Sequence, residues 1–132
     1  MASLTNYTKD GLINLIFSAA AFTAPTTLYV SLHTASPGGT GANEVGGGSY
    51  ARQVVTFTNS TGGAGAVENE TEMEFTMPLV SVSHFAIWDA ATAGNSVWQG
   101  ELRDSGGNPV TRSFVDGDIF RVAIGGLDCT IV

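Results

Sequence analysis

Four glutamates recur at every second position of one stretch, and their carboxylates are the strongest candidates for chemistry in the sequence. They are Glu68, Glu70, Glu72 and Glu74. Side chains alternate between two faces of an extended segment, so all four carboxylates are expected on one face. Three uses are open: a solvated strand face that discourages edge pairing, a hard-cation site, and a contact surface for a basic patch on another protein. Calcium takes about six to eight oxygen ligands, usually from a loop that wraps the ion, and an alternating ladder does not wrap. We therefore expect no metal site.

The other residues that could act as ligands or nucleophiles are isolated in the sequence. Neither His33 nor His84 has a second histidine at metal-binding spacing, so both are expected to be structural. Cys129 is the only cysteine, which excludes an internal disulfide and a multi-cysteine zinc site, and its apolar neighbours predict a buried, inert thiol. The sequence has no Gly-x-Ser-x-Gly, His-Glu-x-x-His or paired-carboxylate spacing. We therefore expect no enzyme activity, no catalytic residues and no cofactor.

The composition predicts one domain with an unusually uncharged surface. At 132 residues the chain fits a single domain spanning residues 1–132. Charged residues make up 13% of the chain, about half the usual share, and 17 residues are glycine. So little charge suggests that part of the surface is covered by neighbouring molecules.

Charge and segment length argue against two classes of partner. The net charge is −7 and only five residues are basic, whereas binding to a phosphate backbone needs a clustered basic surface. The apolar segment 12–24 is too short to span a bilayer and lacks the positive leading region of a signal peptide. We expect neither a nucleic acid nor a membrane as partner.

A central β-hairpin is expected to organise the fold. Its strands are residues 82–89 and 96–102, joined by a turn over 90–95. Bulky apolar groups occur on both faces of the first strand, which is typical of a strand covered on both sides. Both tryptophans, Trp88 and Trp98, lie in this hairpin, and burying one aromatic side chain removes roughly 150 to 250 Å² from water. The hairpin is therefore expected to anchor the core.

One helix and several short strands complete the predicted fold. Apolar residues at helical spacing predict a helix over residues 8–22. Strands are expected at residues 27–33, 49–58, 110–115, 119–124 and 127–132, separated by glycine-rich turns. Seven or eight short strands after one helix predict a mainly β fold, a single antiparallel β-sandwich that is jelly-roll-like.

Residues 36–49 are mostly glycine, alanine, threonine and asparagine and show no periodicity. Unstructured loops longer than about 12 residues are uncommon in compact domains and are usually functional or disordered. Two interpretations stay open, a mobile surface loop and an arm that orders against a neighbouring subunit. The predicted partner contacts lie in and just after this loop: Pro37, Asn43, Glu44, Val45, Tyr50 and Arg52. Arg52 is also expected to pair with a carboxylate inside the fold.

Several stretches of the chain carry a resemblance to a known family. They are residues 28–38, Asn43-Glu44-Val45, Ser49-Tyr50-Ala51-Arg52, residues 84–91, Gly94-Asn95, residues 98–102 and Asp116-Gly117-Asp118. Together they resemble a family of small virion proteins of tailed bacteriophages. Its members are labelled either as tail-fibre-like proteins or as capsid decoration (cement) proteins. The resemblance implies a structural virion protein and supplies no catalytic motif.

Of the two labels, capsid decoration is the expectation. A tail fibre is long and usually repetitive, whereas this chain is short and has no internal repeat. A capsid exterior tolerates an acidic protein, and the interior that faces packaged nucleic acid does not. We expect a cement protein that binds the major capsid protein on the capsid exterior and stabilises the head. By resemblance to other cement proteins, a homotrimer is expected.

The alternative is a tail or tail-fibre-associated virion protein, in one form a module that binds a host glycan. Such a module would present Trp88, Trp98 or Tyr50 as an exposed platform on which a sugar ring stacks. The decoration interpretation instead predicts that both tryptophans are buried.

Overall fold

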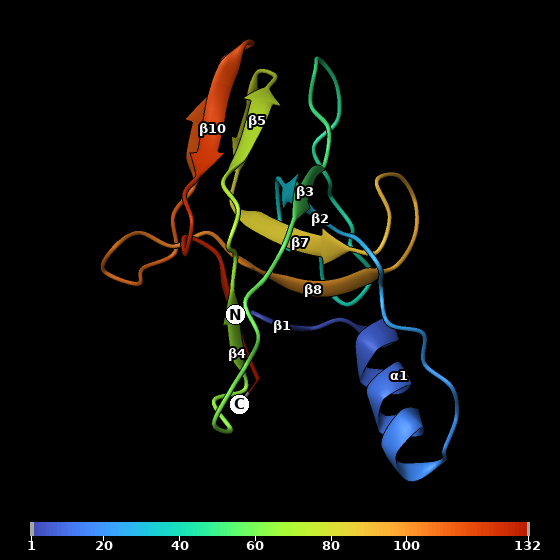
Figure 1. Cartoon of the computed structure of the whole chain (residues 1–132). Helices are drawn as coiled ribbons and strands as arrows, with labels where there is room; N and C mark the ends of the chain where they lie inside the picture. Colours follow the sequence, from blue (N-terminus) through green and yellow to red (C-terminus); the bar gives the residue numbers. More distant parts are fainter. Residues whose placement is uncertain (1, 132) are drawn as a thin grey trace.

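The computed structural model describes residues 2–131, which form one helix and eleven strands (Figure 1). In chain order these are β1 (Ser3–Leu4), α1 (Asn6–Phe17), β2 (Leu28–His33), β3 (Gln53–Val55), β4 (Ala66–Glu68), β5 (Met73–Met77), β6 (Val80–Val82), β7 (His84–Trp88), β8 (Ser96–Glu101), β9 (Arg112–Phe114), β10 (Asp118–Val122) and β11 (Asp128–Thr130). The pairings among these strands are antiparallel. The prediction of a mainly β, antiparallel fold with one helix is confirmed.

The largest sheet has five strands in the order β1-β8-β7-β2-β3, so β7 lies at its centre. The hairpin β7–β8 is the one predicted from the two tryptophans. In its register Ala86 of β7 is opposite Ser31 of β2 on one side and Gln99 of β8 on the other. β7 pairs with a neighbour on each edge, and its residues from Phe85 to Trp88 are buried. Burial of successive residues means that both faces of the strand are covered, which is why both faces carry apolar side chains.

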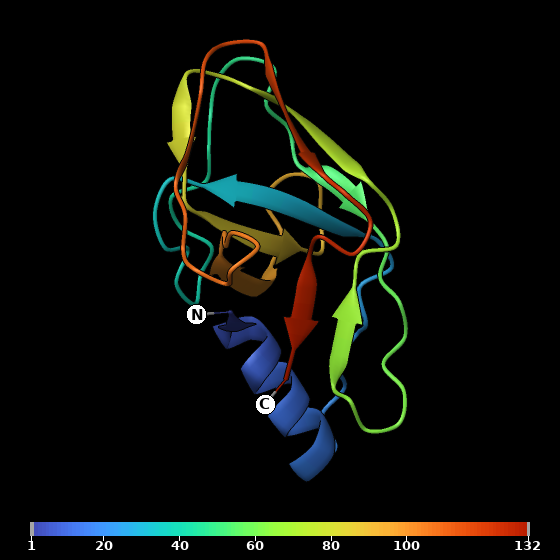
Figure 2. The ribbon, with the colours of Figure 1, turned by 90° about the vertical axis from the view of Figure 1, so that its left-hand side faces the viewer.

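Three two-stranded ribbons surround this sheet: β5–β10, β4–β11 and β6–β9. Figures 1 and 2 show the β5–β10 ribbon at one end of the molecule and the β4–β11 ribbon at the opposite end, where α1 also extends. The chain therefore places two projections, one β and one helical, at the same end.

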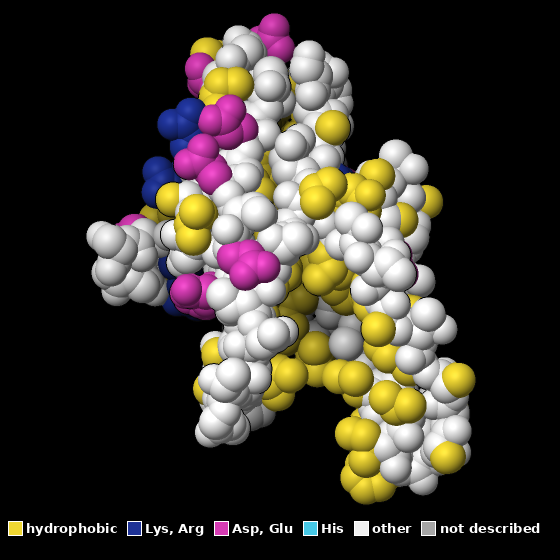
Figure 3. All heavy atoms as spheres, in the orientation of Figure 1, with side chains coloured by type: hydrophobic (Ala, Val, Ile, Leu, Met, Phe, Trp, Pro, Cys, Tyr) yellow, Lys and Arg dark blue, Asp and Glu magenta, His cyan; other side chains and the backbone are white. Residues whose placement is uncertain are grey.

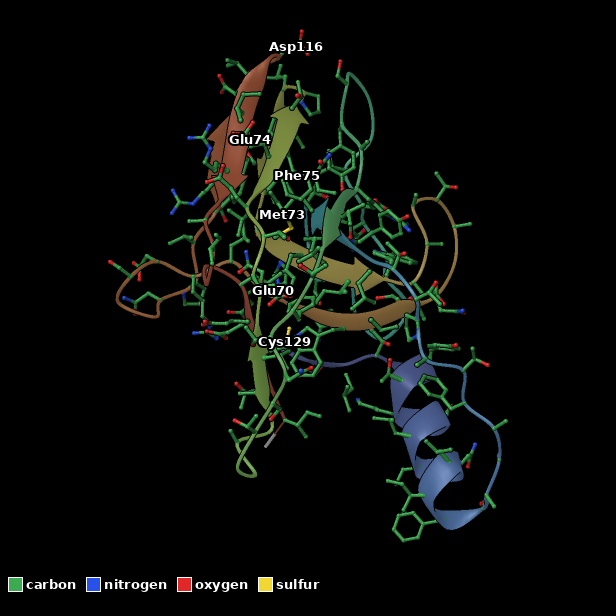
Figure 4. The ribbon with its side chains drawn as sticks, in the orientation of Figure 1. Glu70, Met73, Glu74, Phe75, Asp116 and Cys129 are labelled. Atoms are coloured by element: carbon green, nitrogen blue, oxygen red, sulfur yellow. The ribbon has the colours of Figure 1, made fainter. Side chains whose placement is uncertain are left out.

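The core lies where the ribbons cover one face of the main sheet. It joins Val30 and Leu32 of β2 to Met73 and Phe75 of β5, all of them buried. Met73 and Phe75 lie on one side of β5 and Glu74 on the other (Figure 4), as the period of two in a strand dictates. The Phe75 ring stacks on Tyr50 and meets Phe120 edge to face, with centroids 6.2 and 6.3 Å away.

Several predicted boundaries were wrong. The helix spans Asn6–Phe17 and not residues 8–22, because the chain leaves helical geometry at Ser18 and Ala19 adopts a positive φ of 52°. The predicted strand 49–58 is reduced to β3, since only three of its residues pair with β2. Within residues 2–131 no helix has the length and apolar character that crossing a bilayer requires.

α1 is attached to the sheet by its first turn alone. The Thr8 hydroxyl donates to the Val97 carbonyl at 2.8 Å, the Thr5 hydroxyl donates to the Ser96 carbonyl, and the Asn6 N–H donates to the Gly39 carbonyl at 3.1 Å. Thr5 is the N-cap residue but makes no side-chain capping bond, because its hydroxyl is used on β8. Beyond Thr8 no residue of the helix is buried, so the rest of α1 projects away from the sheet.

Candidate functional site

The loop 36–49 is fastened to the body of the protein by an ion pair. The Arg52 guanidinium donates to both oxygens of the Glu44 carboxylate, with Nε to Oε1 at 2.9 Å and Nη2 to Oε2 at 2.7 Å. The side chain of Arg52 is 7% exposed and that of Glu44 is 25% exposed. This is the bidentate geometry in which arginine binds carboxylates most strongly. The prediction that Arg52 pairs with a carboxylate inside the fold is confirmed.

Arg52 also ties this loop to the β7–β8 turn. Its Nη1 donates to the carbonyls of Ala90 at 2.9 Å and Ala93 at 2.8 Å. The guanidinium carbon lies 3.8 Å from the centroid of the Trp88 ring, a cation–π contact. One buried cation therefore connects three segments that are distant in the sequence.

Of the remaining predicted contact residues, Tyr50 contacts the ion pair, and the others lie in the same loop as Glu44. The Tyr50 hydroxyl donates to Glu44 at 3.3 Å and accepts from the Leu32 N–H at 2.8 Å, and burial raises the pKa of Tyr50. Val45 and Pro37 are buried, and the Val45 N–H donates to the Leu32 carbonyl at 2.9 Å. Asn43 is exposed and adopts a left-handed φ of 64°. The loop is thus ordered within its own chain, and contact of these residues with a partner stays a prediction.

His33 is a structural histidine with both ring nitrogens occupied. Nδ1 lies 2.6 Å from the Ala42 carbonyl and Nε2 lies 2.6 Å from the Ser31 hydroxyl, which also accepts from Trp88 Nε1 at 2.7 Å. A neutral ring with its proton on Nδ1 satisfies the whole chain of donors and acceptors. Burial lowers the pKa of His33, against the opposing effect of its bond to Ala42. Glu44, Arg52 and His84 also act on the ring, the first favouring and the others opposing protonation.

We expect the free energy of unfolding to fall as the pH decreases through about 6.5. The folded chain holds His33 and His84 with lowered pKa values, so the unfolded chain binds protons first and gains stability relative to the folded state. Each histidine contributes a slope of at most about 1.4 kcal/mol per pH unit. Urea titrations between about pH 7 and 5.5 measure this slope. His33→Gln should flatten it, and an unchanged slope in that variant would contradict the assignment.

Both tryptophans are buried, Trp88 at 7% and Trp98 at 6% exposure. They therefore offer no open platform for a sugar ring, and Tyr50 is partly buried and packs against the core. We expect iodide to quench tryptophan fluorescence several-fold less in the folded protein than in urea. Because iodide is repelled by a net charge of −7, neutral acrylamide is the control, and strong quenching by both would contradict burial.

The acidic ladder does not form one strand face. β4 ends at Glu68 and β5 begins at Met73, and the chain between them bends around Asn69, which is fully buried. Its side chain donates to the carbonyls of Thr71 at 2.8 Å and Ala123 at 3.0 Å and accepts from the Leu127 N–H at 2.8 Å.

The four carboxylates are consequently divided. Glu72 and Glu74 pair with Arg121, at 3.4 and 2.5 Å, while Glu68 lies opposite Asp128. Glu70 is exposed in the bend between β4 and β5. Among the described residues, no group of three or more histidine, cysteine, aspartate or glutamate side chains is placed to hold a metal ion. Cys129 is buried near these strands, and burial raises the pKa of its thiol to about 12.

A broad cavity of about 770 Å³ opens beside β9, β10 and β11. Its charged lining residues are Arg103, Arg112, Arg121, Glu101, Asp104 and Asp128. Three cations face three anions, and Arg103 and Arg121 already form ion pairs. The balance of charge gives this cavity no preference for an anionic or a cationic ligand.

The most conspicuous unpartnered surface is on α1, which was predicted as a helix from its apolar stripe. Its side chains Ile13, Leu15, Ile16 and Phe17 are exposed. Figure 3 shows hydrophobic atoms on this helix and an open hollow between it and the end of the molecule that carries β4. Apolar patches of several hundred Å² on a soluble protein mark interaction sites. The missed signal was the absence of charge: residues 11–43 contain no Asp, Glu, Lys or Arg.

One family model matches the chain. It is described as Podophage GP4 fiber I protein gp80, and it covers residues 3–130. No curated protein matches the chain.

Proposed function

The chain belongs to the Podophage GP4 fiber I protein gp80 family, and on that premise we propose that it is a structural component of the tail-fibre apparatus of a tailed-phage virion. In this role it is a rigid unit that joins other virion proteins and catalyses no reaction. The observation that carries the proposal is the family match, which extends over nearly the whole chain. The fibre assignment comes from the description of the family.

The structure supports a passive, rigid role. Its polar groups are used internally: Arg52 binds the Glu44 carboxylate and two carbonyls, and His33 and Asn69 are buried with their side chains hydrogen-bonded. The two most nucleophilic or basic candidates, Cys129 and His33, are both buried. Such groups stabilise a fold and are inaccessible to a substrate.

Capsid decoration remains the second candidate. It is favoured by the shortness of the chain, its lack of an internal repeat and its net charge of −7, which suits an exterior surface. In that case the partners are the major capsid protein and other copies of the chain in a homotrimer. Many moderate contacts of roughly 800 Å² per partner, repeated over a lattice, would then strengthen the head.

Glycan recognition receives less support. The aromatic residues that a sugar-stacking platform requires, Trp88, Trp98 and Tyr50, belong to the buried part of the molecule or pack against it. A fibre component of this kind attaches or spaces other proteins, and recognition of the host falls to another part of the fibre.

Immunogold labelling of intact virions distinguishes the two candidates. Antibodies against the purified chain should place gold at the tail if it is a fibre component. Gold distributed over the head would overturn the fibre proposal in favour of decoration. If gold labels neither the head nor the tail of intact virions, both candidates are contradicted.

A further inference from the structure

We propose that α1 is an assembly arm, and that the projecting helix of one copy packs into the hollow beside α1 of a second copy of the same chain. This goes beyond the proposed function, because it names a surface through which copies of the chain would contact one another. It does not depend on whether the copies are located at the head or at the tail.

The first observation is the extent of the apolar surface on the helix. Leu12, Ile13, Leu15, Ile16 and Phe17 span about 200° of the helix circumference, twice the stripe of about 100° that one packed face needs. Their own chain covers only the opposite side. There the Phe22 ring packs on Gly11 and lies 5.4 Å from the Tyr7 ring.

Gly11 makes this self-packing possible, because a Cβ at that position would lie 2.2 Å from the Phe22 ring. The return segment after the helix therefore lies against one side of α1 and leaves the apolar side uncovered. Ile16 is 70% exposed and Phe17 is 78% exposed. With Ile13 and Leu15 they leave roughly 500 Å² of apolar surface open, a large part of the ~800 Å² per partner that a stable interface buries.

The second observation is that the same molecule has a receiving surface. Figure 3 shows a hollow bordered by α1, by the β4 end of the molecule and by the region of β1 and β8, with hydrophobic atoms along its roof. One end of the molecule therefore carries both a helix with uncovered apolar side chains and a hollow lined by hydrophobic atoms.

The absence of charge on this surface is compatible with a second copy of the chain as the occupant. Each chain carries a net charge of −7, so two copies repel wherever their carboxylates face each other. The uncharged stretch 11–43 includes the exposed part of α1, and there two copies can meet without opposing charges. The anchoring bonds of Thr5 and Thr8 to β8 fix the direction in which the arm projects, so the geometry of the contact is preset.

The test is the mass of the purified chain by sedimentation equilibrium, with the double variant Ile16→Asp, Phe17→Asp. The wild type should associate to a multiple of 13.6 kDa, and the variant should remain at 13.6 kDa with a dissociation constant raised at least 100-fold. Leu79→Asp is the matched control, because Leu79 is 79% exposed outside α1 and should leave the mass unchanged.

Folding of the variant is checked by circular dichroism and thermal melting. Both replaced side chains are mostly exposed, so the melting curve of the monomer should be retained. An oligomer that persists in the double variant would overturn this inference and leave the virion role standing. A wild type that stays at 13.6 kDa up to its solubility limit would also overturn it. Immunogold labelling tests the virion role separately.

Discussion

Replacing Arg52 with alanine is expected to lower the free energy of unfolding by about 3 kcal/mol. Breaking a buried ion pair by removing one partner costs about 3–5 kcal/mol, and the partial exposure of Glu44 places this pair at the lower end. The substitution also leaves the carbonyls of Ala90 and Ala93 without their donor and removes the cation from the Trp88 ring. Urea denaturation measures the change, provided that the dependence of the unfolding free energy on urea concentration is the same for the wild type and the variant.

The control for Arg52 is Arg103→Ala. Arg103 also pairs with a glutamate, Glu101 at 3.2 Å, but its side chain is 48% exposed. An exposed ion pair contributes about 0–1 kcal/mol, so this variant should lose little stability. If both variants lose the same amount of unfolding free energy, then burial of Arg52 and its contacts with the β7–β8 turn do not determine its contribution, and the prediction is contradicted. Arg52→Lys should be intermediate, because lysine keeps the charge and loses the bidentate geometry.

Replacing Phe75 with alanine is expected to have an effect of similar or greater size, about 3–5 kcal/mol. Phe75 is fully buried, and its ring contacts the rings of Tyr50, which follows the loop 36–49, and of Phe120 on β10. Alanine would leave a cavity between the main sheet and the β5–β10 ribbon. Urea denaturation again supplies the measurement.

The comparison for Phe75 is Leu79→Ala, which removes an apolar side chain of similar size from an exposed position. Its effect should stay within about 0.5 kcal/mol, as for most surface substitutions. If Phe75→Ala costs less than about 1 kcal/mol, the core is not centred on β5 as described.

The part of the fold that the sequence predicts best is its centre. Trp88, Trp98 and the apolar residues on both faces of β7 predicted the central hairpin, because a strand covered on both sides needs apolar side chains at every position. The pattern is local and predicted a central, buried strand, whereas the pairing of β7 with β2 joins residues more than 50 positions apart and could not be read from it. The strand ends were less predictable, since pairing depends on which partner residues reach the edge.

The acidic ladder shows why a regular spacing can mislead. The glutamates from Glu68 to Glu74 occupy every second position, as in a strand. The chain nevertheless bends at Asn69, whose buried side chain accepts from the Leu127 N–H and donates to two carbonyls. Two of these partners, Ala123 and Leu127, are 54 and 58 residues away from Asn69 in the sequence. No local pattern contains that information.

The positions of the loop 36–49 and of α1 could not be predicted from local patterns. The glycine-rich loop was open to two interpretations, a mobile loop or an arm, and in the structure Glu44 and Val45 bind it to Arg52 and β2. The helix was predicted from its apolar stripe, and in the structure only its first turn is bound to the sheet. Periodicity identifies an apolar helix face but does not specify whether the surface that covers it belongs to the same chain.

The most direct test of a structural role in the virion is quantitative mass spectrometry of phage particles purified through a density gradient. We expect the chain to be present in purified particles in multiple copies, at a fixed ratio to the major capsid protein from one preparation to the next. Its presence in the infected-cell lysate together with its absence from purified particles would contradict a structural role.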